Sequence, residues 1–234
     1  MARAEGAAVR AIATIYRRSP TVFVAAADSG ITRPQDFVGR TVLVSASGLP
    51  NLRAMLGRVG VTPDQYTVLT APYDVSLFES GATQIWSVYL TGSIHILLEA
   101  GFELNIIYPD DYGVHVYDDT IFATDALVAA EPELVMRFLR ATLQGWTYAI
   151  EHPEDMGALV LQYDPQADVA LETTKMTDSV PLIHTGEDHI GWMRADRWQG
   201  MYDILLDQGL LAGPVDVDAV YTMEFLQSIY GDEP

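Results

Sequence analysis

The stretch TVFVAAADSGITRPQDFVGRTVLVS, residues 21–45, contains two apolar runs separated by polar turns. Residues 21–27 and 40–45 are apolar and rich in β-branched side chains, which predicts strands buried on both faces of a sheet. Between them, Asp28-Ser29-Gly30-Ile31 has the composition of a turn, and residues 33–37 that of a short helical turn. The stretch therefore predicts part of an α/β fold with a covered sheet.

The same alternation extends on both sides of this stretch. Residues 8–15 form another apolar run, which is separated from the first by a polar break at residues 16–20. Downstream, helices and strands are predicted in turn at residues 51–59, 66–69, 75–79, 83–88, 93–100 and 103–107. This order predicts a mainly parallel sheet.

Beyond a further strand at residues 120–124, the pattern changes to long helices. Pro132 suits the first turn of a helix. Apolar and small side chains then recur at helical spacing, which predicts one buried face made of Val135, Phe138, Leu139, Thr142, Leu143 and Trp146. We expect Trp146 to pack against the sheet. Further helices are predicted at residues 153–162, 170–179, 194–208 and 217–229.

Composition excludes several classes of function. The 234 residues include 13 Lys and Arg against 32 Asp and Glu, and the formal net charge of -19 would repel nucleic acid and anionic membranes. The absence of Cys excludes disulfides, thiolate nucleophiles and Cys-ligated zinc. The start of the chain has no apolar stretch of signal-peptide length, and no segment approaches the length of a membrane span, so we expect a soluble chain without an export signal.

Motifs of catalysis and of metal binding are weak. The sequence lacks GxSxG, GxxxxGK[ST], GxGxxG and HExxH, so an enzyme would need an active site without a known sequence motif. His184 and His189 flank Glu187 and Asp188, which could bind a metal, but a surface turn is the favoured interpretation. The sequence therefore predicts no metal, no cofactor and no catalytic residue.

Two loops could bind a small molecule. Ser47-Gly48-Leu49 lies between a predicted strand and the helix that contains Asn51, where backbone N–H groups can face a ligand; a plain tight turn is the alternative. Trp86 and Tyr89 end the strand at residues 83–88, and alternation makes one of them core. We expect Tyr89 to face the ligand.

The second loop is DDYGVHVYDD, residues 110–119. It places several polar and aromatic groups between two buried strands, which is typical of a binding loop, although an ordinary exposed loop is the alternative. The candidate ligand contacts in this loop are Asp111, Tyr112, His115, Tyr117 and Asp119.

These segments resemble a known family. The order of Pro20, the turn at residues 28–31, Pro34-Gln35-Asp36-Phe37 and Gly39-Arg40-Thr41-Val42 resembles the crossover region of type II solute-binding proteins. The segments NIIYPDDYGV at residues 105–114 and PELVMRFLRA at residues 132–141, together with Gly191-Trp192-Met193, resemble the thiamine-pyrimidine-precursor branch of that superfamily, the NMT1/THI5-like and SsuA-related proteins.

The resemblance implies a two-lobed α/β fold that clamps a ligand by hinge closure. Residues 1–28 and 114–234 would form the first lobe, and residues 29–113 the inserted second lobe. Family members carry a further N-terminal segment before the position of Met1, so the first lobe would be incomplete. An incomplete lobe would expose a sheet edge and apolar surface, and we therefore expect a homodimer.

The resemblance also implies a function. Such proteins deliver small solutes to the permease of an ABC importer, in the periplasm or at the cell surface. The implied ligand is an aminopyrimidine-like heterocycle, stacked by Tyr89, Tyr112 and Tyr117, with Asp111 or Asp119 accepting hydrogen bonds and residues 47–49 donating them.

Three alternatives stay open. One is a binding protein for taurine, another alkanesulfonate or nitrate, and another is a truncated sensor or dimerisation module. The third is an enzyme, because eukaryotic pyrimidine synthases resemble these proteins. Those synthases use a Cys-rich iron motif and an active-site His, however, and this chain has no Cys.

Overall fold

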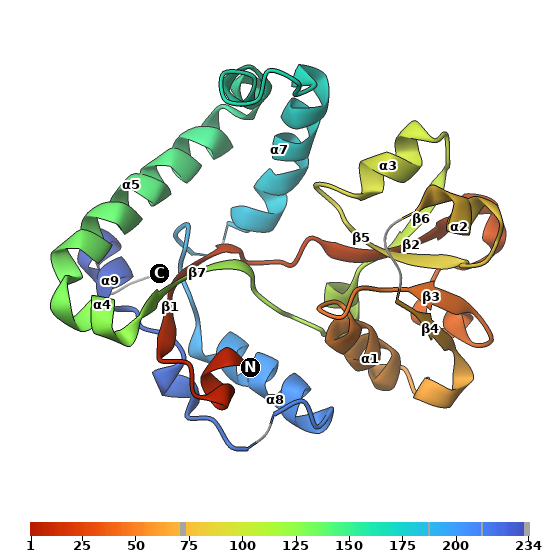
Figure 1. Cartoon of the computed structure of the whole chain (residues 1–234), viewed down its shortest axis with the longest axis horizontal. Coiled ribbons are helices and arrows are strands. Elements are labelled where there is room, and N and C mark those ends of the chain that lie inside the picture. The colour runs from red at the N-terminus through yellow and green to blue at the C-terminus, as the bar shows by residue number, and fades with distance from the viewer. Residues whose placement is uncertain (71–73, 187, 212, 232–234) are drawn as a thin grey trace. The chain divides into compact units, whose positions relative to one another are not determined.

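The computed structural model describes residues 1–70, 74–186, 188–211 and 213–231, and they form two compact units. Unit 1 comprises Met1–Ser19 and Val116–Pro234, and unit 2 is Pro20–His115 (Figure 1). The first segment of unit 1 thus ends at Ser19, before the predicted boundary at residue 28. The reason is that the strand β2 (Thr21–Ala26) is hydrogen-bonded inside the sheet of unit 2.

Unit 2 is built on a five-stranded sheet with the order β4-β3-β5-β2-β6. Its other strands are β3 (Thr41–Leu43), β4 (Thr67–Leu69), β5 (Ile85–Tyr89) and β6 (Leu104–Ile107). Strand β3 runs parallel to β4 and β5, whereas β2 is antiparallel to both β5 and β6. The predicted mainly parallel sheet is therefore right for this unit, with one antiparallel strand, β2, between β5 and β6.

Helices cover both faces of this sheet. Helix α1 (Leu49–Arg58) lies on one side, and α2 (Val75–Glu79) and α3 (Ile94–Glu99) lie on the other (Figure 1). Short 3-10 turns connect the elements: η2 (Ala27–Ser29), η3 (Pro34–Phe37), η4 (Pro63–Gln65) and η5 (Pro109–Tyr112). Side chains at positions 22 to 25 of β2 are buried, as expected for a strand covered on both faces.

Unit 1 contains a two-stranded antiparallel sheet, β1 (Val9–Tyr16) with β7 (Asp118–Thr124). The edge of β1 opposite β7 forms two backbone hydrogen bonds with other segments of unit 1. The Ala11 N–H donates to the Val220 carbonyl, and the Thr14 N–H donates to the Gly191 carbonyl. Within the described residues β7 pairs with β1 alone, so β7 is an edge strand.

The rest of unit 1 is helical. Its elements are η1 (Ala2–Glu5), α4 (Asp125–Ala130), α5 (Pro132–Glu151), η6 (Pro153–Asp155), α6 (Met156–Val160), α7 (Val169–Ile183), α8 (Ala195–Asp207), η7 (Val217–Ala219) and α9 (Glu224–Tyr230). Helix α7 continues past the predicted end at residue 179 and contains Pro181. The last predicted helix, residues 217–229, is interrupted because Tyr221 forms a β-bridge with Ala11.

Helix α5 differs from its predicted buried face. Val135, Leu139 and Leu143 are buried in the core of unit 1, but 57% of Phe138 is exposed and Trp146 is only half-buried. Helical spacing shows which residues share an arc, whereas the packing partners decide which arc is covered. Among the described helices, none is long and apolar enough to span a bilayer.

Candidate functional site

A serine-rich turn follows β3 in unit 2. The Ser45 and Ser47 hydroxyls lie 3.0 Å apart, and the buried Gly48 begins α1 as its N-cap. The Gly48 and Leu49 N–H groups both donate to the Ser45 carbonyl at 3.1 Å, and the Gly48 N–H also lies 3.2 Å from the Ser45 hydroxyl oxygen. These two N–H groups are therefore hydrogen-bonded within the turn, and the contact of residues 47–49 with a ligand stays a prediction. The polar groups that this turn presents are hydroxyls.

The end of β5 lies beside this turn. A Cβ atom added at Gly48 would lie 3.3 Å from the Ser87 hydroxyl oxygen and 3.1 Å from the Val44 side chain. Side chains alternate along a strand, so Ser87 and Tyr89 share one face of β5. Tyr89 is half-exposed, and its N–H donates to the Ser93 hydroxyl at 2.9 Å. Tyr89 thus lies where the sequence predicted, at the end of the strand.

Trp86 points to the opposite face of the sheet. It is fully buried, its ring lies 6.2 Å from that of Phe78, and it belongs to the core beneath α2 and α3. The predicted ligand contact of Trp86 is therefore wrong, because packing by α2 and α3 covers that face of β5.

The turn η5 reaches the same edge of the sheet. Phe23 of β2 pairs with Ser87 on one side and with Ile107 on the other, so β5 and β6 end at the same edge. Asp111 is exposed and Tyr112 is half-exposed there, while His115 Nδ1 lies 2.7 Å from an Asp110 carboxylate oxygen. We call Ser45–Gly48, Ser87, Tyr89 and η5, with His115, the carboxyl edge of unit 2.

The remaining predicted residue of unit 2 lies close by. Asn51 is half-buried in the first turn of α1, three residues beyond Gly48. Gly113 has φ +79°, a left-handed conformation that suits glycine, and an added Cβ there would meet the guanidinium of Arg58 at 3.2 Å. Glycine at this position thus lets η5 pack against α1.

The two predicted ligand residues of unit 1, Tyr117 and Asp119, lie at the start of β7 and differ in exposure. Tyr117 is buried, accepts a hydrogen bond from the Arg194 N–H at 2.9 Å and packs edge-on against Trp198. Burial raises the pKa of the Tyr117 phenol, which stays protonated at neutral pH. The predicted stacking role of Tyr117 is wrong, since its ring belongs to the core. Asp119 is exposed and has φ +45°, which is rare for a residue other than glycine.

Sequence reasoning missed the polar residues around the end of β1. The Ser19 hydroxyl donates to the Asp118 carboxylate at 2.8 Å, and the Tyr16 and Ser179 hydroxyls lie 3.0 Å apart. Arg17 forms an ion pair with Asp188 in which both side chains are almost fully buried. The sequence predicts Arg17 in a polar break, and no local signal distinguishes a buried Arg from an exposed one.

The turn at residues 184–189 is a surface turn only in part. His184 and His189 are exposed, as predicted, but Asp188 is buried by its pairing with Arg17. Glu187 lies outside the described residues. The ring of His189 stacks on Tyr230 at 4.3 Å.

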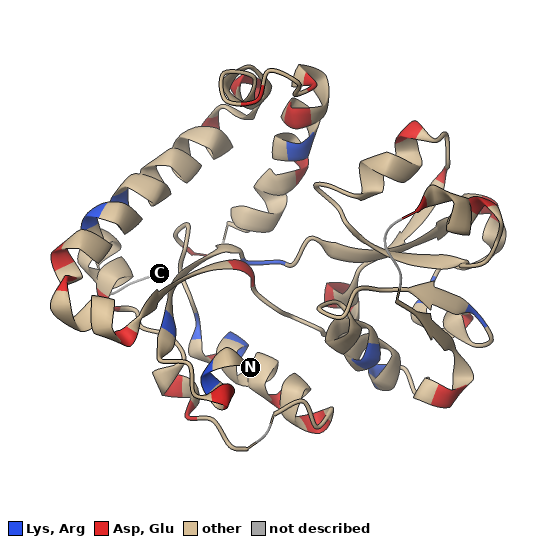
Figure 2. Ribbon diagram, viewed as in Figure 1, with Lys and Arg blue, Asp and Glu red and all other residues tan. Residues whose placement is uncertain are grey.

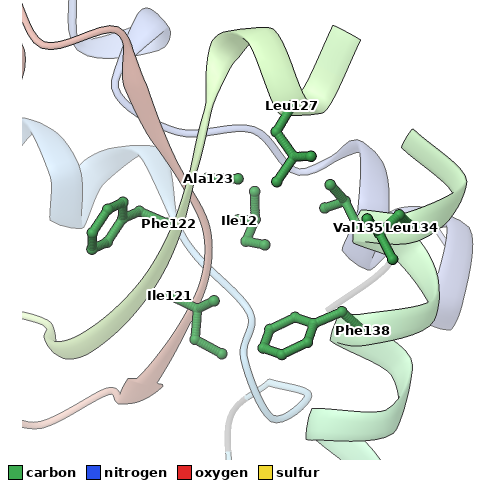
Figure 3. Close-up of a pocket in the computed structure, with 8 residues that line it drawn as sticks. All are labelled: Ile12, Ile121, Phe122, Ala123, Leu127, Leu134, Val135 and Phe138. Carbon is green, nitrogen blue, oxygen red and sulfur yellow. The ribbon is translucent and has the colours of Figure 1, made fainter. Parts of the chain in front are cut away.

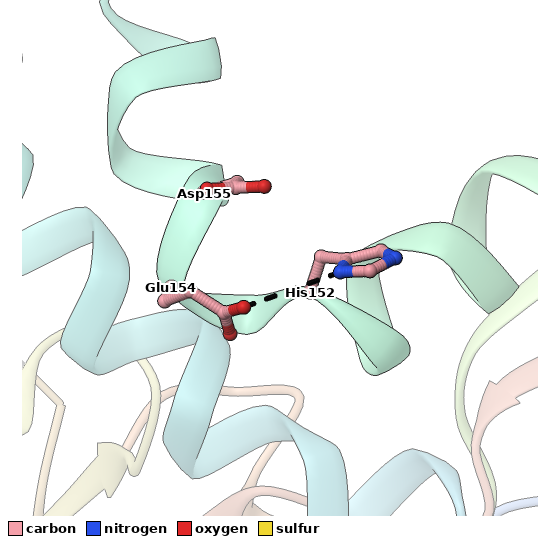
Figure 4. Close-up of side chains that lie close together, drawn as sticks. All are labelled: His152, Glu154 and Asp155. Carbon is pink, nitrogen blue, oxygen red and sulfur yellow. Dashed lines mark ion pairs between the residues drawn. The ribbon is translucent and has the colours of Figure 1, made fainter.

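A second histidine cluster lies at the end of α5. His152, Glu154 and Asp155 offer ligand atoms that lie within 4.8 Å of one another, and His152 Nδ1 is 4.0 Å from a Glu154 oxygen (Figure 4). All three residues lie on the surface turn between α5 and α6. Exposed groups of this kind are common on acidic proteins, and no buried contact fixes their positions, so we assign them no role.

Three named proteins are similar to this chain. Riboflavin-binding protein RibY of Chloroflexus aurantiacus is 28% identical in an alignment 249 residues long. This alignment covers 97% of this chain and 67% of that protein. The formylaminopyrimidine-binding protein of Halalkalibacterium halodurans is 22% identical over 88% of this chain and 67% of that protein. A 4-amino-5-hydroxymethyl-2-methylpyrimidine phosphate synthase of Legionella pneumophila is 28% identical over 96% and 72%, respectively.

The structure confirms the predicted fold class. It matches the periplasmic aliphatic sulphonate binding protein SsuA of Escherichia coli with a TM-score of 0.74 and 16% identity, over 94% of this chain and 70% of that one. At this identity the match shows the fold alone, which is that of type II periplasmic binding proteins. The sequence supplies the closer relationship, because residues 1–156 match the family model described as NMT1/THI5 like. With this match over two thirds of its length, the chain belongs to the NMT1/THI5-like family.

Proposed function

We propose that this protein binds a small aromatic heterocycle, of the riboflavin or aminopyrimidine kind, and passes it to an ABC-type importer. The full-length protein would then work in the periplasm or at the cell surface. The observation that carries the proposal is the carboxyl edge of unit 2, where Ser45, Ser47 and Ser87 hydroxyls gather beside the half-exposed Tyr89. Two of the similar proteins named above are binding proteins for riboflavin and for formylaminopyrimidine.

The chemistry of this edge suits a neutral ring better than an anion. Hydroxyl groups both donate and accept, so they can match the ring N–H and carbonyl groups of a flavin or a pyrimidine. An anion would instead call for Arg side chains or unpaired N–H groups, and the Gly48 and Leu49 N–H groups are already bonded within the turn. Tyr89 supplies an aromatic face at the same edge.

The proposal assigns further contacts to Asp111, Tyr112 and His115 in unit 2. Exposed carboxylates accept hydrogen bonds from ring amino groups, which distinguishes a heterocycle from a sulfonate. Each of these side chains is exposed or half-exposed in its own unit.

Titration tests the proposal. Riboflavin, an aminopyrimidine and taurine would be titrated into the protein by calorimetry, and we expect the first or the second to bind. Tyr89→Ala should weaken binding by about 1–3 kcal/mol, the scale of a lost aromatic contact. Gly48→Val should abolish binding, because even an added Cβ would lie only 3.1 Å from the Val44 side chain and 3.3 Å from the Ser87 hydroxyl, so the larger side chain must displace both.

Tyr163→Ala is the matched control, since Tyr163 is 84% exposed in unit 1 and should leave affinity unchanged. Binding of taurine in preference to both heterocycles would overturn the assigned ligand class. Unchanged affinity in both Tyr89→Ala and Gly48→Val would overturn the assigned site.

We further propose that binding occurs without turnover, although one similar protein is named as a synthase. The carboxyl edge of unit 2 holds one histidine–carboxylate pair, His115 with Asp110 at 2.7 Å, and none of the hydrogen bonds described for His115 joins it to the Ser45, Ser47 or Ser87 hydroxyl. Prolonged incubation with the bound heterocycle, followed by mass spectrometry of the released ligand, should return it unaltered.

A further inference from the structure

The histidine that ends unit 2 is held by a carboxylate of the turn before it. His115 Nδ1 lies 2.7 Å from a carboxylate oxygen of Asp110, five residues earlier in the chain. The turn η5 makes this approach possible, because the Gly113 N–H donates to the Asp110 carbonyl at 3.0 Å. Gly113 has φ +79°, and this left-handed residue reverses the chain toward Asp110. The backbone of the turn thus brings His115 and Asp110 together.

Asp110 decides which ring nitrogen of His115 carries the proton. A carboxylate only accepts hydrogen bonds, so Nδ1 is the donor of this pair. In the neutral ring, a proton on Nδ1 leaves Nε2 as an acceptor. Within the described residues Nε2 of His115 makes no hydrogen bond, and 49% of the side chain is exposed. The carboxyl edge of unit 2 therefore presents a ring nitrogen that can accept a hydrogen bond from a bound molecule.

Other ionisable groups around His115 come from the turn and from α1. The ionisable side chains of η5 and of its N-cap are Tyr108, Asp110, Asp111 and Tyr112. Arg58 of α1 approaches the turn, since a Cβ atom added at Gly113 would lie 3.2 Å from its guanidinium. The strand β2, which also packs against η5, has no charged residue. Of these groups, Asp110 is the one hydrogen-bonded to the His115 ring in the part of the chain that the structure describes, so it sets the tautomer.

An apolar hollow in unit 1 offers no comparable partner. It has a volume of about 300 Å³ and is lined by eight aliphatic or phenylalanine side chains. Figure 3 shows two of them, Ile121 and Phe138, facing each other across it. None of the eight side chains carries a hydrogen-bonding atom. The N–H groups of a heterocycle would lose their hydrogen bonds to water there without replacement, so the carboxyl edge of unit 2 suits them better.

We propose that His115 Nε2 accepts a hydrogen bond from a ring N–H or amino group of the bound heterocycle. Asp110 is then a positioning residue, because it holds the tautomer in which Nε2 is the acceptor. This assignment rests on the proposed function and deepens it, since it names the ligand feature that the site selects. A flavin presents a ring N–H and an aminopyrimidine an amino group, whereas a sulfonate group presents acceptors only.

The same hydrogen bond makes the affinity depend on pH. Histidine is the side chain whose charge changes between about pH 5 and pH 8. Protonation turns Nε2 from an acceptor into a donor, which then opposes the N–H group of the ligand. The affinity should therefore be full at the alkaline end of this range. It should fall about tenfold as the pH drops, because a hydrogen bond is lost and two donors are left facing each other.

Calorimetric titration with riboflavin from about pH 8 to about pH 5.5 tests this dependence, because the ring N–H of riboflavin keeps its proton throughout. His115→Gln keeps an acceptor that does not titrate, so its affinity should stay level. His115→Phe keeps a ring without nitrogen and should bind about tenfold more weakly than the parent protein at about pH 8. His152→Gln is the matched control, since His152 is similarly exposed and lies 4.0 Å from a Glu154 oxygen in unit 1. It should keep the profile of the parent protein.

Matched ligands test the atom that His115 contacts. Riboflavin is compared with the flavin methylated at its ring N–H. In the same way, 4-amino-5-hydroxymethyl-2-methylpyrimidine, the compound in the name of the similar synthase, is compared with the pyrimidine that lacks the amino group. In the parent protein, loss of the N–H should weaken binding about tenfold, whereas in His115→Phe it should change little. Protonation of the pyrimidine ring itself affects all variants alike.

Nitrogen NMR of the ligand-free protein tests the tautomer directly. At about pH 8 the His115 ring should carry its proton on Nδ1, and Asp110→Ala should remove this preference. Circular dichroism of this variant should show an intact fold, because the Asp110 side chain lies at the surface of unit 2. A neutral His115 ring with its proton on Nε2 in the parent protein would overturn the proposal.

Two binding results would also overturn it. One is the same pH dependence in the parent protein and in His115→Gln, and the other is equal affinity for the ligands with and without the N–H group. Either result leaves the proposed function intact, since a heterocycle still binds. If neither riboflavin nor the aminopyrimidine binds at any pH, the proposed function itself is wrong, and the role of His115 falls with it.

Discussion

At the scale of single residues, unit 1 contains a buried ion pair between Arg17 and Asp188. The accessible fractions of the two side chains are 5% and 2%, and the Arg17 guanidinium also donates to the Asp188 carbonyl at 3.4 Å. Burying two charges gains little net stability, but removing one of them leaves the other without compensation in a medium of low dielectric constant. The pair fixes the end of β1 to the turn before Trp192.

Replacing Asp188 tests this account. Asp188→Asn keeps the shape of the side chain but leaves the Arg17 charge unpaired, and it should lower the free energy of unfolding by about 3–5 kcal/mol. Chemical denaturation measures this loss. Asp196→Asn is the control, since the Arg194–Asp196 pair is exposed and should contribute no more than ~1 kcal/mol. Equal effects of the two variants would contradict the buried pairing.

Two tryptophans of unit 1 should differ in their contribution to stability. Trp192 is 6% exposed and belongs to the core cluster, so Trp192→Ala should cost about 3–5 kcal/mol. Trp146 is only half-buried on α5, and Trp146→Ala should cost less, on the order of 1–2 kcal/mol. Parallel denaturation curves of the two variants would show the difference, and the reverse order would mean that the packing of α5 is misassigned.

At the scale of elements, Asp125 ties the chain terminus to the start of α4. Its carboxylate accepts hydrogen bonds from Arg10 of β1 at 2.6 Å and from Arg3 of η1 at 2.9 Å. These bonds, with that of Arg10 the stronger, lower the pKa of Asp125 below its ordinary value of 3.8. The negative charge also lies at the first position of α4, where the helix dipole favours it.

The sign of this pKa shift predicts a pH dependence. Because the pKa of Asp125 is lower in the folded state, the carboxylate stabilises the fold above pH 3.8 and loses this effect as the pH falls below that value. Asp125→Asn should therefore lower the Tm at neutral pH, and its difference from the parent protein should shrink in acid. Thermal melts at several pH values measure this; a difference that stays constant with pH would contradict the assignment.

At the scale of the whole molecule, the net charge of -19 acts on every association. Acidic residues occur in both units (Figure 2). Two copies of the chain repel each other through this charge, and added salt screens the repulsion.

We therefore expect that the homodimer predicted from the sequence, if its contact is mainly apolar, tightens as salt is added. Sedimentation at constant protein concentration and increasing ionic strength measures this trend. A dimer that dissociates steadily with salt would mean that ion pairs, and not apolar contacts, hold it together.

The sequence by itself determined the features that depend on neighbouring residues. Alternating apolar runs defined the strands and helices of unit 2, and Ser47-Gly48-Leu49 marked the turn before α1, because chain reversals and pleats are local properties. Tertiary structure decided which side of each element is covered. Trp86 and Tyr117 became core, Phe138 stayed exposed, and Arg17 was buried, because each outcome depends on a partner far away in the sequence, such as Phe78, Trp198 or Asp188. Periodicity defines the faces of an element, but only the packing of distant segments determines which face loses contact with water.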